Sequence, residues 1–182
     1  MSNPRHAPGH SRGLSAIELL AVLAVSSVVL AAAVPSLRGV TAGTHLSNAS
    51  NALVVGLQRA RSEAVSTGRN SVLCPSPDGM RCADTSDWSS GWLLYRDQNR
   101  NSRFDAGEPL LHTQSLDPLQ VSIRSNNGRR RVTYRSLGES EGANTTFILC
   151  SRLESARGRQ VIVANSGRVR LLDQAPATGC TP

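Results

Sequence analysis

A long apolar run near the start of the chain dominates its hydrophobic pattern. Between Leu14 and Val34 the only charged side chain is Glu18. At about 1.5 Å of rise per residue, a helix over this run nearly matches the roughly 30 Å thickness of the hydrocarbon core of a bilayer. The polar residues before the run include Arg5 and Arg12, which favour a cytoplasmic N-terminus. The run is therefore predicted to be a helix that can span a membrane.

The helical pattern continues after Pro35. Small or apolar residues recur every three or four positions, which is the spacing of one face of a helix. They are Leu46, Ala49, Leu53, Leu57, Ala60 and Ala64. The helix is expected to continue to about Ser66 and to stop at Gly68. Because this second part is amphipathic, it must pack its apolar face on another layer of the protein.

Eight short runs rich in apolar and β-branched residues follow, and turn-forming residues separate them. They cover residues 71–74, 92–96, 110–116, 120–124, 131–135, 145–150, 160–164 and 168–172. These strands supply the layer that the amphipathic helix needs. We expect an α+β fold in which a long N-terminal helix packs on antiparallel sheets. The expected segments are a leader (1–13), a membrane-spanning helix (14–36), its amphipathic continuation (37–68) and a β-rich head (69–182).

The four cysteines, Cys74, Cys82, Cys150 and Cys180, contain no CxxC pair, and no histidines stand at zinc-finger spacing. Disulfides are therefore favoured over a metal site, and three pairings are possible. We favour Cys74 with Cys82, which closes a short loop, and Cys150 with Cys180, which ties the C-terminal tail to a strand. Such bonds indicate an oxidising compartment, either the periplasm or the cell exterior.

The N-terminal motif resembles that of type IV pilins and type II secretion pseudopilins. The resemblance rests on Gly13, Leu14, the sequence Ile17-Glu18-Leu19-Leu20 and Pro35, the helix-kinking proline of the family. It implies cleavage after Gly13 by prepilin peptidase, N-methylation of Leu14, storage in the inner membrane and polymerisation with other pilins. Most members of the family have Phe where this chain has Leu14.

A carboxylate in lipid is costly unless a positive charge neutralises it. Cleavage after Gly13 would give Leu14 a free α-amino group, and this amine on a neighbouring subunit can pair with Glu18. We therefore expect Gly13, Leu14 and Glu18 to serve processing and assembly.

The head resembles the FimT/GspH branch of minor pilins and pseudopilins. Its sheet content, its two expected disulfides and the turn at Asn165-Ser166-Gly167 carry this resemblance. The segment DWSSGWLLYRDQNRNSRFDAGEPLL, residues 87–111, matches the branch particularly well. The resemblance implies a periplasmic head that later stands on the surface or at the tip of a pilus.

Charge separates the last third of the chain from the rest. The formal net charge is +7, and all 20 basic residues are arginines, which suit bidentate binding of phosphate. Acids outnumber arginines over residues 74–123, whereas arginines far outnumber acids over residues 124–170. The basic character therefore belongs to the C-terminal third.

The sequence GRVR, Gly167 to Arg170, matches the GRxR motif that characterises the FimT members that bind DNA in natural transformation. In a strand, Arg168 and Arg170 would share a face about 6.7 Å apart. We expect these residues to form a DNA-binding surface with six other arginines. Those are Arg129, Arg130, Arg131, Arg152, Arg157 and Arg159.

The expected partner is double-stranded DNA, bound through its phosphates and independently of sequence, because the chain has few aromatic residues that could stack on bases. The alternative is that these arginines are solvated and partly pair with Glu139, Glu141 and Glu154.

A polar segment over residues 97–108 has a weak likeness to a calcium loop. Its oxygen-bearing residues at the first, third, fifth, ninth and twelfth positions are Asp97, Asn99, Asn101, Asp105 and Glu108. Ser102 stands where such a loop needs glycine, and Arg100 and Arg103 oppose a cation. We favour a polar hairpin in which Asp and Asn cap their own backbone and these two arginines pair with the carboxylates.

The remaining motifs give no support to an enzyme. His45 and His112 have no evident Ser, Cys or Asp partner at motif spacing, and the chain has no Walker loop, Rossmann fingerprint or HExxH motif. No catalytic residue and no cofactor is predicted. Trp88 and Trp92 are expected to pack against the helix or to cap the core.

The sequence therefore predicts a FimT-like minor pilin that joins a type IV pilus and binds extracellular DNA for uptake. The expected location is the inner membrane, as a single-pass precursor, and then the pilus. The alternative is a GspH- or FimU-type subunit that acts only in assembly of a pilus or of a type II secretion pseudopilus.

Overall fold

The computed structural model describes residues 15–142, 144–154, 157–173 and 180, with the backbone alone over residues 31–38. Helix α1 (Ala16–Thr67) ends where the sequence predicts, because Gly68 adopts a positive φ of 65°. The chain divides into two compact units, residues 1–38 and residues 39–182, and each is described by itself.

The first unit contains the apolar part of α1. Its large apolar side chains between Ile17 and Leu30 are 52–75% exposed. Among the described residues, no helix combines the length and the hydropathy needed to cross a membrane. Residue 14 and the side chains of 31–36 lie outside the described part, so the membrane-spanning helix predicted for residues 14–36 stays a prediction.

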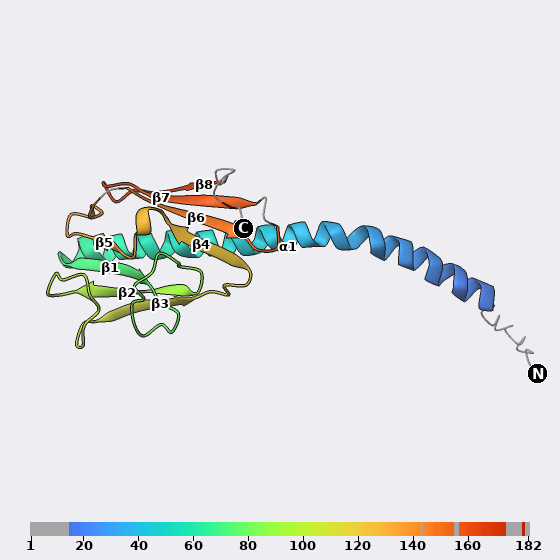
Figure 1. Cartoon of the computed structure of the whole chain (residues 1–182), viewed down its shortest axis with the longest axis horizontal. Coiled ribbons are helices and arrows are strands. Elements are labelled where there is room, and N and C mark those ends of the chain that lie inside the picture. Colours follow the sequence, from blue (N-terminus) through green and yellow to red (C-terminus); the bar gives the residue numbers. More distant parts are fainter. Residues whose placement is uncertain (1–14, 143, 155–156, 174–179, 181–182) are drawn as a thin grey trace, which may run out of the picture. The chain divides into compact units, whose positions relative to one another are not determined.

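The second unit contains two four-stranded antiparallel sheets (Figure 1). The first sheet has the order β3-β2-β1-β5, and the second, called sheet B here, has the order β4-β6-β7-β8. The strands are β1 (Asn70–Pro75), β2 (Gly91–Asp97), β3 (Leu110–Ser115), β4 (Val121–Ser125), β5 (Val132–Tyr134), β6 (Thr145–Ser151), β7 (Gly158–Val163) and β8 (Val169–Leu172), with a 3-10 turn η1 (Asn126–Gly128). All eight predicted strands are present, and the predicted α+β architecture is confirmed.

The apolar face of α1 forms the centre of the core. All six residues of the predicted stripe, from Leu46 to Ala64, are at most 4% exposed, and they pack in one cluster with residues of both sheets. Trp92 is fully buried against the helix, where a Cβ added at Gly56 would lie only 2.9 Å from the indole Nε1. Trp88 is also buried and meets Phe147 edge to face, with ring centroids 5.0 Å apart.

Both disulfides also lie in this unit and have the pairing that the sequence favours, Cys74 with Cys82 and Cys150 with Cys180. Because the core cluster and both disulfides fall within residues 39–182, this unit has what a domain needs to fold alone.

Strand alternation gives sheet B an inner and an outer face. Its buried residues Ile123, Leu149, Val161 and Val163 belong to the core cluster with α1. Residues at the intervening positions of the same strands therefore point away from the helix. This division decides which arginines of the C-terminal third can reach a ligand.

Candidate nucleic-acid interface

The hairpin between β7 and β8 is a tight turn closed by backbone hydrogen bonds. The N–H of Gly167 donates to the carbonyl of Ala164 at 2.8 Å, and the N–H of Ala164 donates to the carbonyl of Arg168 at 2.9 Å. Gly167 has a φ of +77°, and a Cβ added there would lie 1.9 Å from the carbonyl oxygen of Gly138. Only glycine fits both the conformation and the space.

Helix α1 holds this turn in place through Arg61. Its Nε donates to the carbonyl of Gly138 at 2.9 Å, and its Nη2 donates to the carbonyl of Ser166 at 3.2 Å. Gly167 itself is buried. The structure therefore gives Gly167 a role in positioning the turn, and its expected contact with DNA stays a prediction. The sequence offered no signal for the part played by Arg61 and Gly138, which lie far apart along the chain.

Arg170 lies on the outer side of β8, and Arg168 immediately precedes that strand. The register pairs Val163 with Val169 and Ile162 with Arg170, so Val169 packs against the core while the two arginines face away from it. Both arginines are exposed, and within the described residues neither side chain has a hydrogen bond or ion pair. Two such cations about 6.7 Å apart along a strand can bind two phosphates of one nucleic-acid chain.

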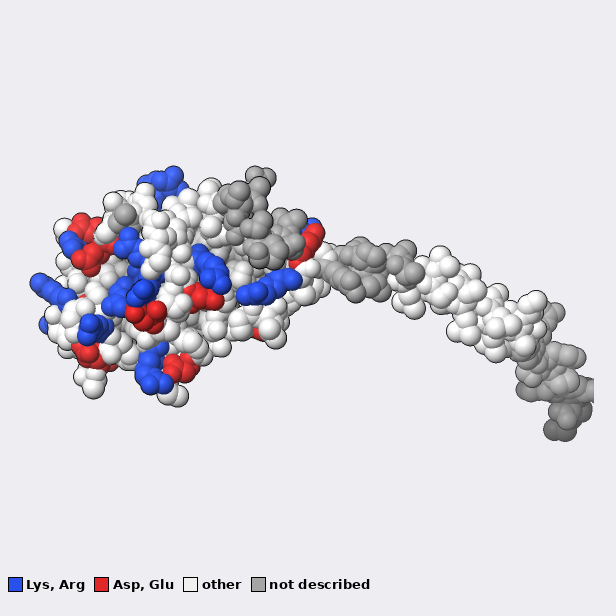
Figure 2. Space-filling view, in the orientation of Figure 1, with Lys and Arg blue, Asp and Glu red and all other residues white. Residues whose placement is uncertain are grey.

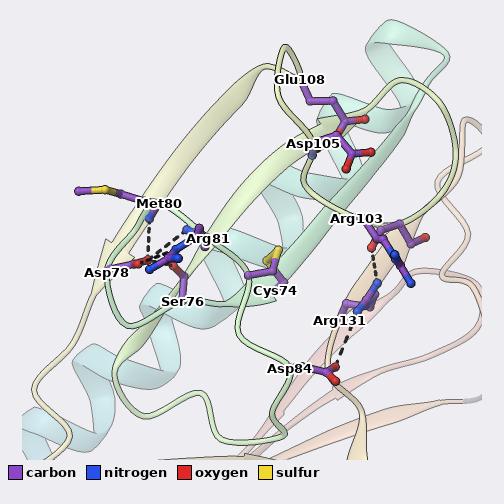
Figure 3. Close-up of a disulfide and its surroundings, with 12 residues drawn as sticks. Cys74, Ser76, Asp78, Met80, Arg81, Asp84, Arg103, Asp105, Glu108 and Arg131 are labelled. Atoms are coloured by element: carbon purple, nitrogen blue, oxygen red, sulfur yellow. Dashed lines mark hydrogen bonds and ion pairs between the residues drawn. A yellow bond between two sulfur atoms is a disulfide. The ribbon is translucent and has the colours of Figure 1, made fainter.

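The three arginines after η1 lie in a different environment. Arg130 Nη1 contacts Asp84 Oδ2 at 2.6 Å, and Arg131 Nη2 lies 4.0 Å from Asp84 Oδ1. Arg131 also donates to the carbonyl of Ser102. Figure 3 shows Asp84 beside Arg131, close to the disulfide loop. The hydrogen bond from Arg130 holds the pKa of the Asp84 carboxyl below its ordinary value. Arg129 lies against Gly142, where an added Cβ would be 2.8 Å from Nη1.

Arg159 points to the inner side of sheet B. It has the same parity along β7 as the buried residues Val161 and Val163. Its Nε lies 3.3 Å from Asp173 Oδ1, and its Nη1 donates to the hydroxyl of Ser50 on α1 at 3.0 Å. The prediction that Arg159 faces DNA with Arg168 is therefore not supported by its position. The sequence predicts a strand that begins at residue 160. In the structure β7 begins at Gly158, so Arg159 lies inside the strand.

The last two predicted arginines lie in the loop between β6 and β7. Arg157 contacts Glu154 at 2.8 Å, and its guanidinium lies against the helix, 3.3 Å from the position of a Cβ at Gly43. Arg152 donates from Nε to the carbonyl of Pro118 at 3.0 Å, and it forms no ion pair within the part of the chain that the structure describes. Of the predicted set, only Arg168 and Arg170 combine exposure with the lack of any partner among the described residues.

Acidic groups neutralise much of the basic third. Arg135 contacts Glu141 at 2.8 Å and Glu139 at 3.9 Å, which adds to the ion pairs already described. On the face that Figure 2 shows, red acidic groups lie beside many of the blue basic ones. The positive charge that remains available to a ligand is thus more local than the net charge of +7 suggests.

The comparisons with known proteins place this fold in a family. The family model described as type II transport protein GspH matches residues 49–167. The chain belongs to the GspH family. It is a minor pilin or pseudopilin of this family, and the match includes β1 to β7 and the hairpin turn up to Gly167.

Individual relatives agree with this assignment. The chain is 29% identical over 170 residues to the pilin-like protein PilA1 of Thermus thermophilus, covering 88% of this chain and 97% of that one. The crystal structure of the type IV minor pilin FimU of Pseudomonas aeruginosa has a TM-score of 0.55 at 23% identity, over 75% of this chain and all of that chain. The minor pseudopilin EpsH of the Vibrio cholerae type II secretion system has a TM-score of 0.51 at 13% identity, over 71% and 97%. The last two likenesses show the fold.

The segment of this GspH-family head that resembles a calcium loop satisfies its carboxylates internally. Asp97 accepts hydrogen bonds from the N–H groups of Asn101 and Ser102, at 3.2 and 3.0 Å. Asp105 accepts from the side-chain amides of Asn99 and Asn101, at 2.9 and 2.6 Å. Within the described ranges, no group of three or more His, Cys, Asp or Glu side chains is arranged to hold a metal ion.

Asparagines, rather than the expected Arg100 and Arg103, therefore donate the hydrogen bonds to Asp105. The hydrogen bond from Asn99, followed by that from Asn101, lowers the pKa of the Asp105 carboxyl. Glu108 accepts from the N–H groups of Gln98 and Asp105, at 2.9 and 3.1 Å. The loop is thus a self-bonded polar hairpin, and Figure 3 shows Asp105 and Glu108 side by side on it.

Proposed function

We propose that this protein assembles into a type IV pilus through the apolar part of α1 and that its head binds double-stranded DNA through Arg168 and Arg170. The DNA part of this proposal rests on the exposed pair Arg168 and Arg170, which have no side-chain partner among the described residues. The match of Gly167–Arg170 to the GRxR motif supports it. Retraction of the pilus would then deliver the bound DNA for uptake.

The assembly part rests on the exposed apolar side chains between Ile17 and Leu30. Such a surface is unfavourable in water and is stabilised when neighbouring helices or lipid cover it. In the proposal, prepilin peptidase cleaves after Gly13, Leu14 is methylated, and the precursor waits in the inner membrane. Glu18 then pairs with the α-amino group of a neighbouring subunit. Gly13 and Leu14 lie outside the described residues.

Glu18→Ala tests the assembly part directly. The variant should be produced and processed but lost from sheared pili, because the paired carboxylate no longer sets the register between helices. Quantitative immunoblotting of the sheared fraction and the cell fraction measures this. Normal amounts of Glu18→Ala in sheared pili would contradict the assembly proposal.

Titration of the head, residues 39–182, with double-stranded DNA at several salt concentrations tests the DNA part. Arg168→Ala/Arg170→Ala should weaken binding at least about 10-fold and lower the salt slope by about two, since each phosphate contact contributes about 0.9 to that slope. Arg81→Ala/Arg100→Ala, which removes the same charge from loops of the other sheet, is the matched control. Equal losses in the two double variants would show that binding is diffuse and not centred on β8.

A role in assembly alone is the second candidate function. The likeness to FimU, described as a type IV minor pilin, and to EpsH, described as a minor pseudopilin of a secretion system, favours it. In this case the head binds other minor subunits, and the correctly oxidised head does not bind DNA at low salt. Charge reversal at Arg168 and Arg170 would then leave function unchanged, whereas Glu18→Ala would still abolish assembly.

A further inference from the structure

The register of sheet B places Arg124 of strand β4 on the same outer face as Arg170 of strand β8. Arg124 of β4 pairs with Ile148, Ile148 pairs with Gln160, and Gln160 pairs with Leu172 of β8. Paired residues on neighbouring strands of a sheet point to the same side. Arg170 lies two residues before Leu172 and therefore shares that side. No sequence pattern joins Arg124 to the GRVR motif, because 43 positions separate it from Gly167.

Arg152 lies beside the start of β4, whereas Arg124 is near the other end of that strand, and the charges of both arginines act on Asp87. Its backbone N–H donates to the carbonyl of Gln120 at 2.9 Å, and its Nε donates to the carbonyl of Pro118 at 3.0 Å. Arg124 and Arg152 are called the β4 cluster below, and Arg168 and Arg170 the β8 pair. Both clusters belong to sheet B, one at each of its edges.

Asp87 forms an ion pair with Arg124 of the β4 cluster. Its Oδ2 lies 3.9 Å from Arg124 Nη2, and both side chains are well exposed, at 40% and 68%. Burial acts to raise the pKa of the Asp87 carboxyl, but the hydrogen bonds from Ser89 and then the charges of Arg124 and Arg152 outweigh it, so that this pKa is lowered. A long, solvated ion pair of this kind is weak, and a phosphate can compete with the carboxylate for Arg124.

The separation of the two clusters suits a duplex. Three strand spacings lie between β4 and β8, which amounts to about 14 Å. The major groove of B-DNA is about 12 Å wide between its bordering backbones. The sheet residues between the clusters in this row, Ile148 and Gln160, carry no charge and so do not repel phosphate.

We propose that the β4 cluster is a second phosphate-binding site, that it and the β8 pair bind the two backbones bordering one groove of a DNA duplex, and that Asp87 weakens this contact. The proposal rests on the proposed function, since it assumes that the β8 pair binds DNA. It makes outer sheet B, rather than the hairpin alone, the DNA-binding surface, and it gives the head a preference for duplex over a single strand.

The test measures affinity and salt slope for the head, residues 39–182, and its variants on a duplex of about 20 base pairs and on one of its single strands. Arg124→Gln should weaken duplex binding several-fold and lower the salt slope by about one. Arg81→Gln, an exposed arginine of the disulfide loop, is the matched control and should change little. Arg124→Gln should also reduce the preference for duplex over the single strand.

Asp87→Asn provides a variant whose expected effect cannot come from misfolding. Asp87 accepts hydrogen bonds from the backbone N–H of Ser89 at 3.0 Å and from its hydroxyl at 2.5 Å. Asparagine keeps an oxygen that can accept both hydrogen bonds, but it removes the negative charge. Duplex affinity should rise several-fold, and this rise should disappear when Arg124→Gln is added.

Three outcomes separate the claims. Weaker binding by Arg124→Gln together with tighter binding by Asp87→Asn supports the second site. If Arg124→Gln matches Arg81→Gln while Arg168→Ala/Arg170→Ala loses binding, the second site is wrong and the proposed function stands. If the unmodified head binds no DNA at low salt, the DNA part of the proposed function fails and the second site fails with it.

Discussion

Replacing Gly167 with alanine should destabilise the head strongly. A non-glycine residue in the left-handed region costs about 1–2 kcal/mol, and Gly167 has a φ of +77°. The new Cβ would also lie 1.9 Å from the carbonyl oxygen of Gly138, so the two turns must move apart. Overpacking of this kind costs about 1–3 kcal/mol. We expect a loss of about 3 kcal/mol in the free energy of unfolding.

Thermal unfolding of the oxidised head measures this loss. For a domain of this size, about 3 kcal/mol corresponds to a fall in Tm of roughly 10 °C. Gly128→Ala is the matched control, because Gly128 has a φ of +63° but nothing within 4 Å of an added Cβ. It carries only the conformational cost of about 1–2 kcal/mol and should lower Tm by roughly half as much.

Equal effects of Gly167→Ala and Gly128→Ala would refute the argument from close packing between the two turns. A Tm unchanged by Gly167→Ala would refute the whole account of this turn. Arg168→Ala/Arg170→Ala should leave Tm nearly unchanged, since these side chains have no partner among the described residues. Stability and DNA binding are therefore expected to separate within a single four-residue motif.

Three further outcomes are expected. Arg159→Gln should lower Tm by a few degrees, because it loses an ion pair and a hydrogen bond to α1, while the salt slope of DNA binding stays the same. Millimolar calcium should leave Tm unchanged, because the carboxylates of residues 97–108 accept hydrogen bonds within the loop; a clear rise would refute this. Hydrogen bonds from the backbone N–H groups of Met80 and Arg81 lower the pKa of the Asp78 carboxyl to about 2. The Tm should therefore stay constant down to about pH 4 and fall between about pH 4 and pH 2, where this carboxylate becomes protonated. Thermal unfolding at a series of pH values measures this.

The elements of the head could be predicted from the sequence because their signals are local. The six-residue stripe from Leu46 to Ala64 has helical spacing, and every member is buried. Each strand stands between turn-forming residues, and the left-handed Gly68 ends the helix where expected. The disulfide pairing followed from loop length and from the position of the tail, since Cys74 and Cys82 are only 8 residues apart.

The partners of the arginines could not be predicted, because they come from distant segments. Arg130 contacts Asp84, 46 positions away, and Arg159 bonds to Ser50, 109 positions away. A count of charges in the C-terminal third treats these arginines as equivalent to Arg168. The structure separates them according to the face of the sheet and the nearest carboxylate.

This separation has a consequence for how strongly one subunit can bind DNA. If two to four arginines of sheet B contact phosphate, the salt slope for one head is only about two to four, and binding is expected to be weak at physiological salt. A filament that displays several heads along one duplex can exceed the affinity of a single head by about 10²–10⁴ without any new contact. If the proposed function is correct, assembly through α1 makes DNA capture effective because it brings several heads onto one duplex. A variant such as Glu18→Ala, with its head unchanged, should lose DNA capture by cells even though the isolated head still binds.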